Sequence, residues 1–233
     1  MLTVHITSSN LIDNKEETML IYDLEQGSDE WHKLRLGVIT ASNLDKVITP
    51  TGSKSGQFDK YMNKLIAELL TGEEEQLYFS DAMQRGIDLE AEAVLHYGAQ
   101  AMCIPKSVGF ILRDDGRVGV SPDRVIRGSG LLEVKCPLQT THTANLISGE
   151  IDKKYIPQVQ GQMWIAEREW CDWMSYHPDL PASIVRIERD DEFIAKMSEL
   201  IDMFVSKMDT KINILKDKGV TFKAGFGNAD KTD

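Results

Sequence analysis

The sequence predicts one domain of the α/β or α+β class. The chain has 233 residues, of which 42% are hydrophobic, and this is enough to bury one sizeable core. Segments with apolar residues at helical spacing alternate with short apolar segments that have strand character. No internal repeat is present, and we find no boundary at which a second domain would begin. We therefore treat residues 1–233 as a single domain.

The N-terminal part of the chain is predicted to contain short helices. Residues 1–20 alternate weakly between apolar and polar and then turn polar, so we expect a peripheral or flexible arm. Ser28 suits the N-cap of a short helix that runs through Arg35. Thr40 would cap a second helix, which Pro50 would end.

Arg35 and Ser42 lie on either side of the turn between these helices and form a candidate anion pocket. Free N–H groups at a helix start, the helix dipole and a guanidinium group all favour a phosphate. The alternative is an exposed arginine and an ordinary first-turn serine. Lys60 and Lys64 lie four residues apart and would either meet a phosphate backbone or form a solvated helix face.

Two longer helices are predicted next. One covers residues 58–70 and ends near Gly72, and the other begins near Ser80 and ends at Gly98. Glu90 lies on or beside the apolar stripe of the second helix. An acid in that position needs a partner, which would be either a salt bridge at the edge of the core or a metal ion shared with other carboxylates.

Two β-hairpins are predicted in the middle of the chain. In the first, residues 110–112 and 118–120 flank a turn at 114–116. In the second, a turn at 127–130 follows Ser121-Pro122-Asp123 and precedes a strand that ends before Pro137.

The second hairpin carries the candidate chemistry. Glu133 and Lys135 share one face of their strand, because successive side chains point to opposite faces. Folding back at the turn would bring Asp123 near Glu133. Mg²⁺ takes oxygen ligands, usually one or two carboxylates together with waters and substrate phosphate. The hairpin therefore predicts a metal-dependent nuclease centre.

The C-terminal half is predicted to supply scaffold. Residues 139–145 form a polar connection to a helix on which Tyr155, Gln158 and Gln162 share one face beside the apolar stripe. The remaining predicted elements are strands at 170–176 and 184–188, a long amphipathic helix at 193–208, and a peripheral or flexible tail at 223–233.

The composition excludes several kinds of function. A formal net charge of −11 argues against a broad basic surface, so a DNA-binding groove would have to be local. Cys103, Cys136 and Cys171 form no CxxC pair, and the five histidines form no H-x-H or H-E-x-x-H pair, so no zinc or iron–sulfur site is indicated. No stretch approaches the roughly 18 apolar residues of a membrane span. We expect a soluble protein of the cytoplasm.

Four short segments stand out along the chain: Trp31 to Ser42, Ser121-Pro122-Asp123, Glu133 to Pro137, and Gln158-Val159-Gln160. In their order and approximate spacing, they resemble the bacteriophage lambda exonuclease family of the PD-(D/E)xK nuclease superfamily. The resemblance runs from about Glu25 to Met208.

This resemblance implies a restriction-endonuclease-like core, with a central mixed β-sheet flanked by helices. It also implies a Mg²⁺-dependent exonuclease, with Mn²⁺ as a substitute, that degrades one strand of linear duplex DNA in the 5′→3′ direction. The products would be mononucleotides and a 3′ single strand for an annealing protein. The enzyme would be a ring-shaped homotrimer, in the bacterial cytoplasm if it is phage or prophage encoded.

The resemblance assigns roles residue by residue. Asp123, Glu133, the Val134 carbonyl and Glu90 would hold two ions, and Lys135 would activate or orient the attacking water. Gln158 and Ser121 fall on active-site positions. Arg35 and Ser42 fall on the pocket for the substrate 5′-phosphate, Trp31 falls on a DNA-contacting position, and Met83 replaces a leucine that acts as an apolar wedge.

Two other functions remain open at this point. A structure-specific endonuclease would use the same two acids and lysine. A catalytically silent protein that binds DNA ends would keep the fold without the reaction, although intact Asp123, Glu133 and Lys135 argue against it.

Overall fold

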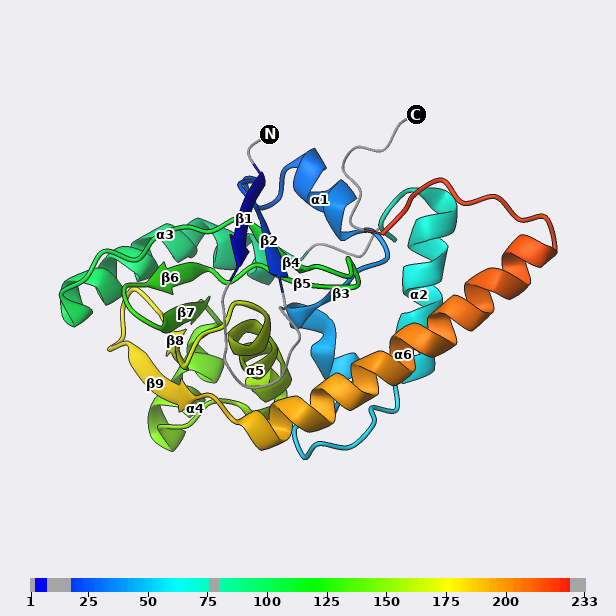
Figure 1. Cartoon of the computed structure of the whole chain (residues 1–233). Coiled ribbons are helices and arrows are strands. Elements are labelled where there is room, and N and C mark those ends of the chain that lie inside the picture. The colour runs from blue at the N-terminus through cyan, green and yellow to red at the C-terminus, as the bar shows by residue number, and fades with distance from the viewer. Residues whose placement is uncertain (1–2, 8–17, 76–79, 227–233) are drawn as a thin grey trace.

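The computed structural model describes residues 3–7, 18–75 and 80–226 and contains two mixed β-sheets with helices around them (Figure 1). This confirms the predicted mixture of helices and strands, but the strands form two sheets of five and four strands rather than one central sheet. Among the described residues, no helix has the length and apolar character needed to cross a membrane.

The first sheet has the strand order β1-β2-β4-β5-β3. These strands are β1 (Thr3–Thr7), β2 (Thr18–Tyr22), β4 (Phe110–Arg113), β5 (Val118–Val120) and β3 (Ile39–Thr40). Only β3 and β5 are parallel.

The described part of residues 1–20, for which we predicted a peripheral or flexible arm, contains β1 at the edge of the sheet and the first residues of β2. β2 pairs antiparallel with β4, and β1 pairs with β2. The pairing satisfies backbone groups of β4 that would otherwise form an open sheet edge. Residues 1–2 and 8–17 lie outside the described residues.

The second sheet carries the hairpin with the candidate chemistry, in the order β6-β7-β8-β9. Its strands are β6 (Arg124–Ile126), β7 (Gly130–Lys135), β8 (Trp170–Ser175) and β9 (Ser183–Glu188). β7 pairs antiparallel with β6 and parallel with β8, so it is an interior strand and nearly all of its residues are buried.

The predicted helix starts and ends are confirmed at several positions. α1 (Asp29–Arg35) and α3 (Asp81–Ala101) begin after the capping residues Ser28 and Ser80, and α2 (Phe58–Thr71) ends at Gly72 in the left-handed conformation. α3 continues to Ala101, beyond Gly98, where the sequence predicted its end. A Cβ there would lie 2.9 Å from the carbonyl oxygen of Cys103, so glycine is needed where the chain folds back.

Two segments differ from their predictions. The second helix predicted from Thr40 is a short 3₁₀ helix, η1 (Ala41–Lys46). The polar connection at 139–145 belongs to a helix, α4 (Gln139–Ser148), that the sequence did not predict because its buried side is polar. His142 and Asn145 on that side are buried and both bond to Ser175 Oγ, at 2.8 and 3.0 Å.

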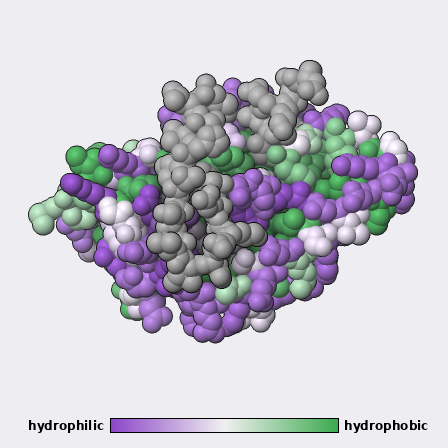
Figure 2. All heavy atoms as spheres, viewed as in Figure 1, coloured by the Kyte–Doolittle hydropathy of each residue, from purple (hydrophilic) through white to green (hydrophobic). Residues whose placement is uncertain are grey.

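Two further helices complete the scaffold. α5 (Ile156–Ile165) follows a 3₁₀ turn, η2 (Lys153–Tyr155), and α6 (Asp191–Asp217) runs from the second sheet past α5 to α2 (Figure 1). Outside the grey atoms, the face shown in Figure 2 is mainly hydrophilic, with hydrophobic areas near its left end and in its right half.

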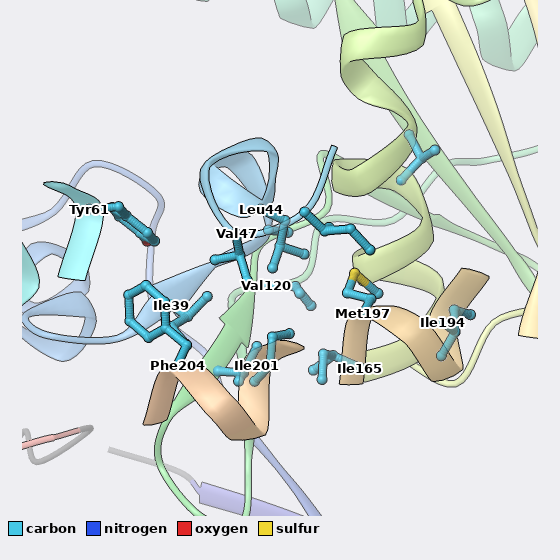
Figure 3. Packing of buried hydrophobic residues seen from close by; sticks show 14 of the residues in the cluster. Ile39, Leu44, Val47, Tyr61, Val120, Ile165, Ile194, Met197, Ile201 and Phe204 are labelled. Atoms are coloured by element: carbon cyan, nitrogen blue, oxygen red, sulfur yellow. The ribbon is translucent and has the colours of Figure 1, made fainter. Parts of the chain in front are cut away.

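The largest core cluster lies where η1, α2, α5 and α6 meet the sheets (Figure 3). Phe204 of α6 packs edge-on against Phe58 of α2, with ring centroids 4.9 Å apart. Gly161 allows α5 to approach η1 closely, because a Cβ at this position would lie 2.1 Å from Leu44 Cδ1. This close approach brings α5 beside the segment that follows β3.

The start of the predicted peripheral tail is attached to the domain. The backbone N–H groups of Lys223 and Ala224 donate to the Leu69 carbonyl near the end of α2, at 2.9 and 3.0 Å. Phe226 lies 3.6 Å from the Arg117 guanidinium carbon, measured to its ring centroid. Residues 227–233 lie outside the described residues.

Candidate active site

A cavity of about 200 Å³ lies where α1, η1, β7 and α5 converge. Most residues that the sequence placed in the site line this cavity, namely Trp31, Arg35, Ser42, Ser121, Asp123, Glu133, Lys135 and Gln158. The structure therefore brings together side chains that lie more than 120 positions apart in the sequence.

The second hairpin places Asp123 beside the strand that carries Glu133. Asp123 precedes β6, and its Oδ2 accepts a hydrogen bond from the Val134 N–H at 2.6 Å. Burial raises the pKa of Asp123 well above its ordinary value, and the nearby Glu133 carboxylate raises it further, whereas Lys135 acts in the opposite direction. Two carboxyl groups in such proximity favour a bound cation.

Glu133 is 2% exposed and accepts hydrogen bonds from three side chains. Lys135 Nζ and Gln158 Nε2 both donate to its Oε1 at 2.5 Å. Gln162 Nε2 donates to its Oε2 at 2.7 Å. From the sequence we placed Gln162 on the same helix face as Gln158 but assigned it no role. Its position four residues after Gln158 was the one feature that could have predicted a place in the site.

Lys135 is held as an ammonium group by this arrangement. Burial lowers the pKa of Lys135, but the Glu133 and Asp123 carboxylates together raise it above its ordinary value. Its Nζ also lies 5.3 Å from the Tyr155 ring centroid. With these partners, the ammonium group can donate hydrogen bonds.

The same cavity is also lined by Arg35, whose guanidinium group is only partly satisfied among the described residues. The Arg35 guanidinium carbon lies 3.6 Å from the Trp31 ring centroid, and among the described residues its buried Nε has no acceptor. Burial lowers the pKa of Arg35, which Glu74, Tyr61 and Glu68 partly oppose. An anion would satisfy this guanidinium group.

Trp31, Ser121 and Ser42 line the same cavity as Arg35. The Trp31 indole Nε1–H donates to Ser121 Oγ at 3.0 Å, which fixes the ring that covers Arg35. Ser42 is exposed in the first turn of η1, with its Oγ 3.4 Å from Thr40 Oγ1. Because η1 is a single short 3₁₀ segment, the helix dipole contributes less here than the sequence suggested.

Glu90 lies in a neighbouring cavity of about 490 Å³, which shares Asp123 with the first. Its Oε1 accepts a hydrogen bond from Arg124 Nη1 at 2.9 Å, and the same Nη1 donates to the Asp123 carbonyl oxygen at 2.5 Å. The structure thus shows the salt bridge, one of the two partners that the sequence left open for Glu90, and it places Glu90 in the cavity next to the one that Glu133 lines.

Met83 lies outside both cavities. It is 51% exposed in the first turn of α3, and Ile87 in the next turn is 59% exposed. The apolar stripe predicted for this helix is buried only farther along, at Val94. This part of α3 therefore presents apolar side chains to solvent near the second cavity, which Ile87 also lines.

The donor set fits a hard cation. Asp123 and Glu133 offer the two carboxylates that Mg²⁺ commonly uses, and a buried amide oxygen, Gln162 Oε1, has no hydrogen-bond donor among the described residues. Among those residues, no group of three or more acidic, histidine or cysteine side chains converges on one point. This agrees with the Glu90 carboxylate being bonded to Arg124.

The fold and the buried acid–acid–lysine set define a nuclease with a restriction-endonuclease-like core. The sequence model of the YqaJ-like viral recombinase domain matches residues 30–169. The chain belongs to this family, and the predicted resemblance to the lambda exonuclease family is confirmed.

Solved structures of exonucleases are similar to this chain. The alkaline exonuclease LHK-Exo of Laribacter hongkongensis is 35% identical, with a TM-score of 0.75, over 82% of this chain and 98% of that one. LHK-Exo in complex with dAMP is 36% identical, with a TM-score of 0.76 and the same coverage.

A phage-related exonuclease from Haemophilus somnus is 18% identical, with a TM-score of 0.63, over 76% of this chain and 96% of that one, and it supports the fold alone. Among curated protein sequences, none matches the chain.

Proposed function

We propose that this protein is a Mg²⁺-dependent exonuclease that degrades one strand of linear duplex DNA in the 5′→3′ direction. It would release mononucleotides and leave a 3′ single-stranded end. The observation that carries the proposal is that Asp123, Glu133 and Lys135 share one cavity with Arg35, whose buried Nε has no acceptor among the described residues. The same cavity thus offers a hydrolytic centre and a group that suits a terminal phosphate.

Asp123 and Glu133 would hold the ion, with the Val134 carbonyl as a further ligand. When bound, such an ion lowers the pKa of a coordinated water and offsets charge that develops on the phosphate. Mn²⁺ is expected to substitute for Mg²⁺. A second ion would require Glu90 to exchange its Arg124 partner for that ion.

Lys135 would orient the attacking water or a phosphate oxygen by donating a hydrogen bond. Its proximity to two carboxylates favours this role over proton acceptance, because both stabilise the ammonium form. Gln158 would hold the same Glu133 oxygen that Lys135 contacts, so the carboxylate keeps a donor when Lys135 turns towards substrate.

The part of the cavity around Arg35 would bind the 5′ end of the DNA. Arg35 and Ser42 would bind the 5′-phosphate, and Trp31 would keep the guanidinium in place by covering it. Ser121 would fix Trp31 and contact the same strand. Met83, exposed at the start of α3, would act as the apolar wedge that separates the strands.

The comparisons support this proposal in two respects. The alkaline exonuclease that is 36% identical has been crystallised with dAMP, a mononucleotide of the kind proposed as product. The family description, viral recombinase, is consistent with a 3′ single strand that is handed to an annealing protein. We further propose a ring-shaped homotrimer that acts in the cytoplasm of a bacterial host.

A polarity assay tests the proposal. Linear duplex labelled at the 5′ or the 3′ end is incubated with Mg²⁺, and closed circular plasmid serves as the comparison substrate. We expect early release of the 5′ label as a mononucleotide, and an intact plasmid. Cutting of the closed circle at the rate of linear DNA would instead indicate an endonuclease, and binding without release would indicate a silent end-binding protein. A mass measurement in solution tests the trimer.

A further inference from the structure

We infer that Gln162 is a positioning residue in this site. Its Nε2–H fixes the carboxylate plane of Glu133, so that this carboxylate keeps the orientation in which it would hold the ion. The inference rests on the proposed function, because it presupposes a divalent cation at Asp123 and Glu133.

The contact with Glu133 is well defined. Gln162 is 1% exposed, and its Nε2 donates to Glu133 Oε2 at 2.7 Å. Lys135 and Gln158 both donate to the other oxygen, Oε1. The last side-chain torsion of a glutamate has a broad energy minimum. Hydrogen-bond donors on one oxygen alone therefore leave the carboxylate plane free to rotate. Gln162 is the side chain that fixes the second oxygen.

The orientation of the Gln162 carboxamide follows from its neighbour. The reversed orientation would place Oε1 against the Glu133 carboxylate, so that two acceptors would face each other. Nε2 therefore points to Glu133, and Oε1 points elsewhere. That oxygen is buried, yet it has no hydrogen-bond donor among the described residues. A buried acceptor without a donor is unfavourable, and most such groups in proteins have a partner.

Gln162 lines the same cavity as Asp123 and Glu133. Its contact with Glu133 Oε2 therefore lies at the site where the two carboxylates would hold the ion.

Helix α5 is a rigid support for such a residue. Gly161 packs so closely against Leu44 that a Cβ would lie 2.1 Å from Leu44 Cδ1, and Met163, next to Gln162, is fully buried in the core. The helix also contains an internal comparison. Gln160 is 3% exposed, donates to the Glu188 carbonyl oxygen and accepts from the Asp190 N–H, both at 2.9 Å, and it does not line the cavity.

The test compares Gln162→Met with the matched control Gln160→Met. Each variant keeps the side-chain length and loses the hydrogen bonds of one buried glutamine in the same helix. Mn²⁺ is titrated calorimetrically into each protein without DNA, and thermal unfolding is followed separately in EDTA. We expect both variants to be less stable in EDTA. Only Gln162→Met should bind Mn²⁺ more weakly, by roughly 10–100-fold.

The outcomes separate this inference from the proposed function. Wild-type affinity for Mn²⁺ in Gln162→Met overturns the inference alone. Absence of Mn²⁺ binding by the wild-type protein overturns the proposed function and the inference with it. If Gln162→Met fails to fold, Gln162→Asn replaces it, since this change keeps an amide but shortens it by one methylene, and the same weakening is expected.

A kinetic measurement adds a second readout. In the presence of linear DNA, Gln162→Met should require a higher Mg²⁺ concentration for half-maximal rate, while the KM for DNA stays unchanged. An unchanged Mg²⁺ requirement with a raised KM for DNA would contradict the assignment of Gln162 to the ion.

Discussion

Replacing Glu133 by glutamine tests the centre of the site with the smallest change in shape. In the wild-type protein, Glu133 accepts bonds from the side chains of Lys135, Gln158 and Gln162. A carboxamide has one acceptor oxygen and one N–H₂ group, so at least one of these donors would face another donor. The variant also removes one of the two carboxylates expected to hold the ion.

The magnitude follows from these contacts. Hydrogen bonds to charged groups each contribute about 1.5–3 kcal/mol, but removing the Glu133 charge also relieves its repulsion with Asp123. We therefore expect a net loss of about 1–3 kcal/mol in the free energy of unfolding without metal. For a chain of this size, each 1 kcal/mol lowers the unfolding midpoint by about 2–4 °C. Nucleotide release should fall by roughly a thousandfold or more, because the variant loses an ion ligand as well as the charge.

The assay combines nucleotide release in Mg²⁺ with DNA binding by fluorescence anisotropy in EDTA and with thermal unfolding. The matched control is Asp172→Asn, because Asp172 is also a buried carboxylate, paired with Arg186 and Tyr97, but it does not line the cavity. The control should lose stability and keep nucleotide release. Near-wild-type release by Glu133→Gln would refute the site assignment.

Three further predictions follow from the same structure. We expect linear DNA with a 5′-phosphate to be degraded faster than the same DNA with a 5′-hydroxyl, and Arg35→Ala should reduce this rate ratio by roughly 10–100-fold. A preserved ratio would show that the phosphate binds elsewhere. The raised pKa of Asp123 means that the native state holds this proton more tightly than the unfolded chain. Stability in EDTA should therefore fall as the pH rises from about 4 through the folded pKa, and Asp123→Asn should flatten this part of the profile of unfolding midpoint against pH. Gly161→Ala should lower the free energy of unfolding by about 1–3 kcal/mol, because its Cβ would collide with the buried Leu44. Gly86→Ala, in the open interior of α3, should leave stability unchanged or raise it by up to about 1 kcal/mol, and equal denaturation midpoints for the two variants would contradict the packing argument.

Strongly local signals predicted most elements of the fold. Ser28 and Ser80 cap helices through their own side chains, and Gly72 ends α2 in a conformation that glycine adopts readily. The alternation of residues 132–135 identified β7, because one face of that strand packs against the core. These signals act within a few residues and therefore appear in the sequence itself.

The elements that were missed depend on contacts between distant segments. β2 is specified by its pairing with β4, about 90 positions away. The buried side of α4 is polar because His142 and Asn145 find a hydrogen-bond partner in Ser175, which no local pattern shows. The segment after Thr40 forms a 3₁₀ helix where α5 packs against it.

The sequence by itself determined the residue types of the site. The Asp123, Glu133 and Lys135 pattern, together with the segments around Arg35 and Gln158, was enough to predict a nuclease of the family to which the chain belongs. The antiparallel hairpin then brings Asp123 to the Val134 N–H through backbone pairing alone.

Only the tertiary structure decided how these residues are shared between two cavities. Glu90 is bonded to Arg124 in one cavity, and Gln162 is bonded to Glu133 in the other, while Asp123 lines both. The physical reason is that burial makes each polar group depend on a particular partner, and the partners come from different helices and strands. A sequence pattern predicts which groups are present, whereas the packing of α3 and α5 against β7 determines which of them meet.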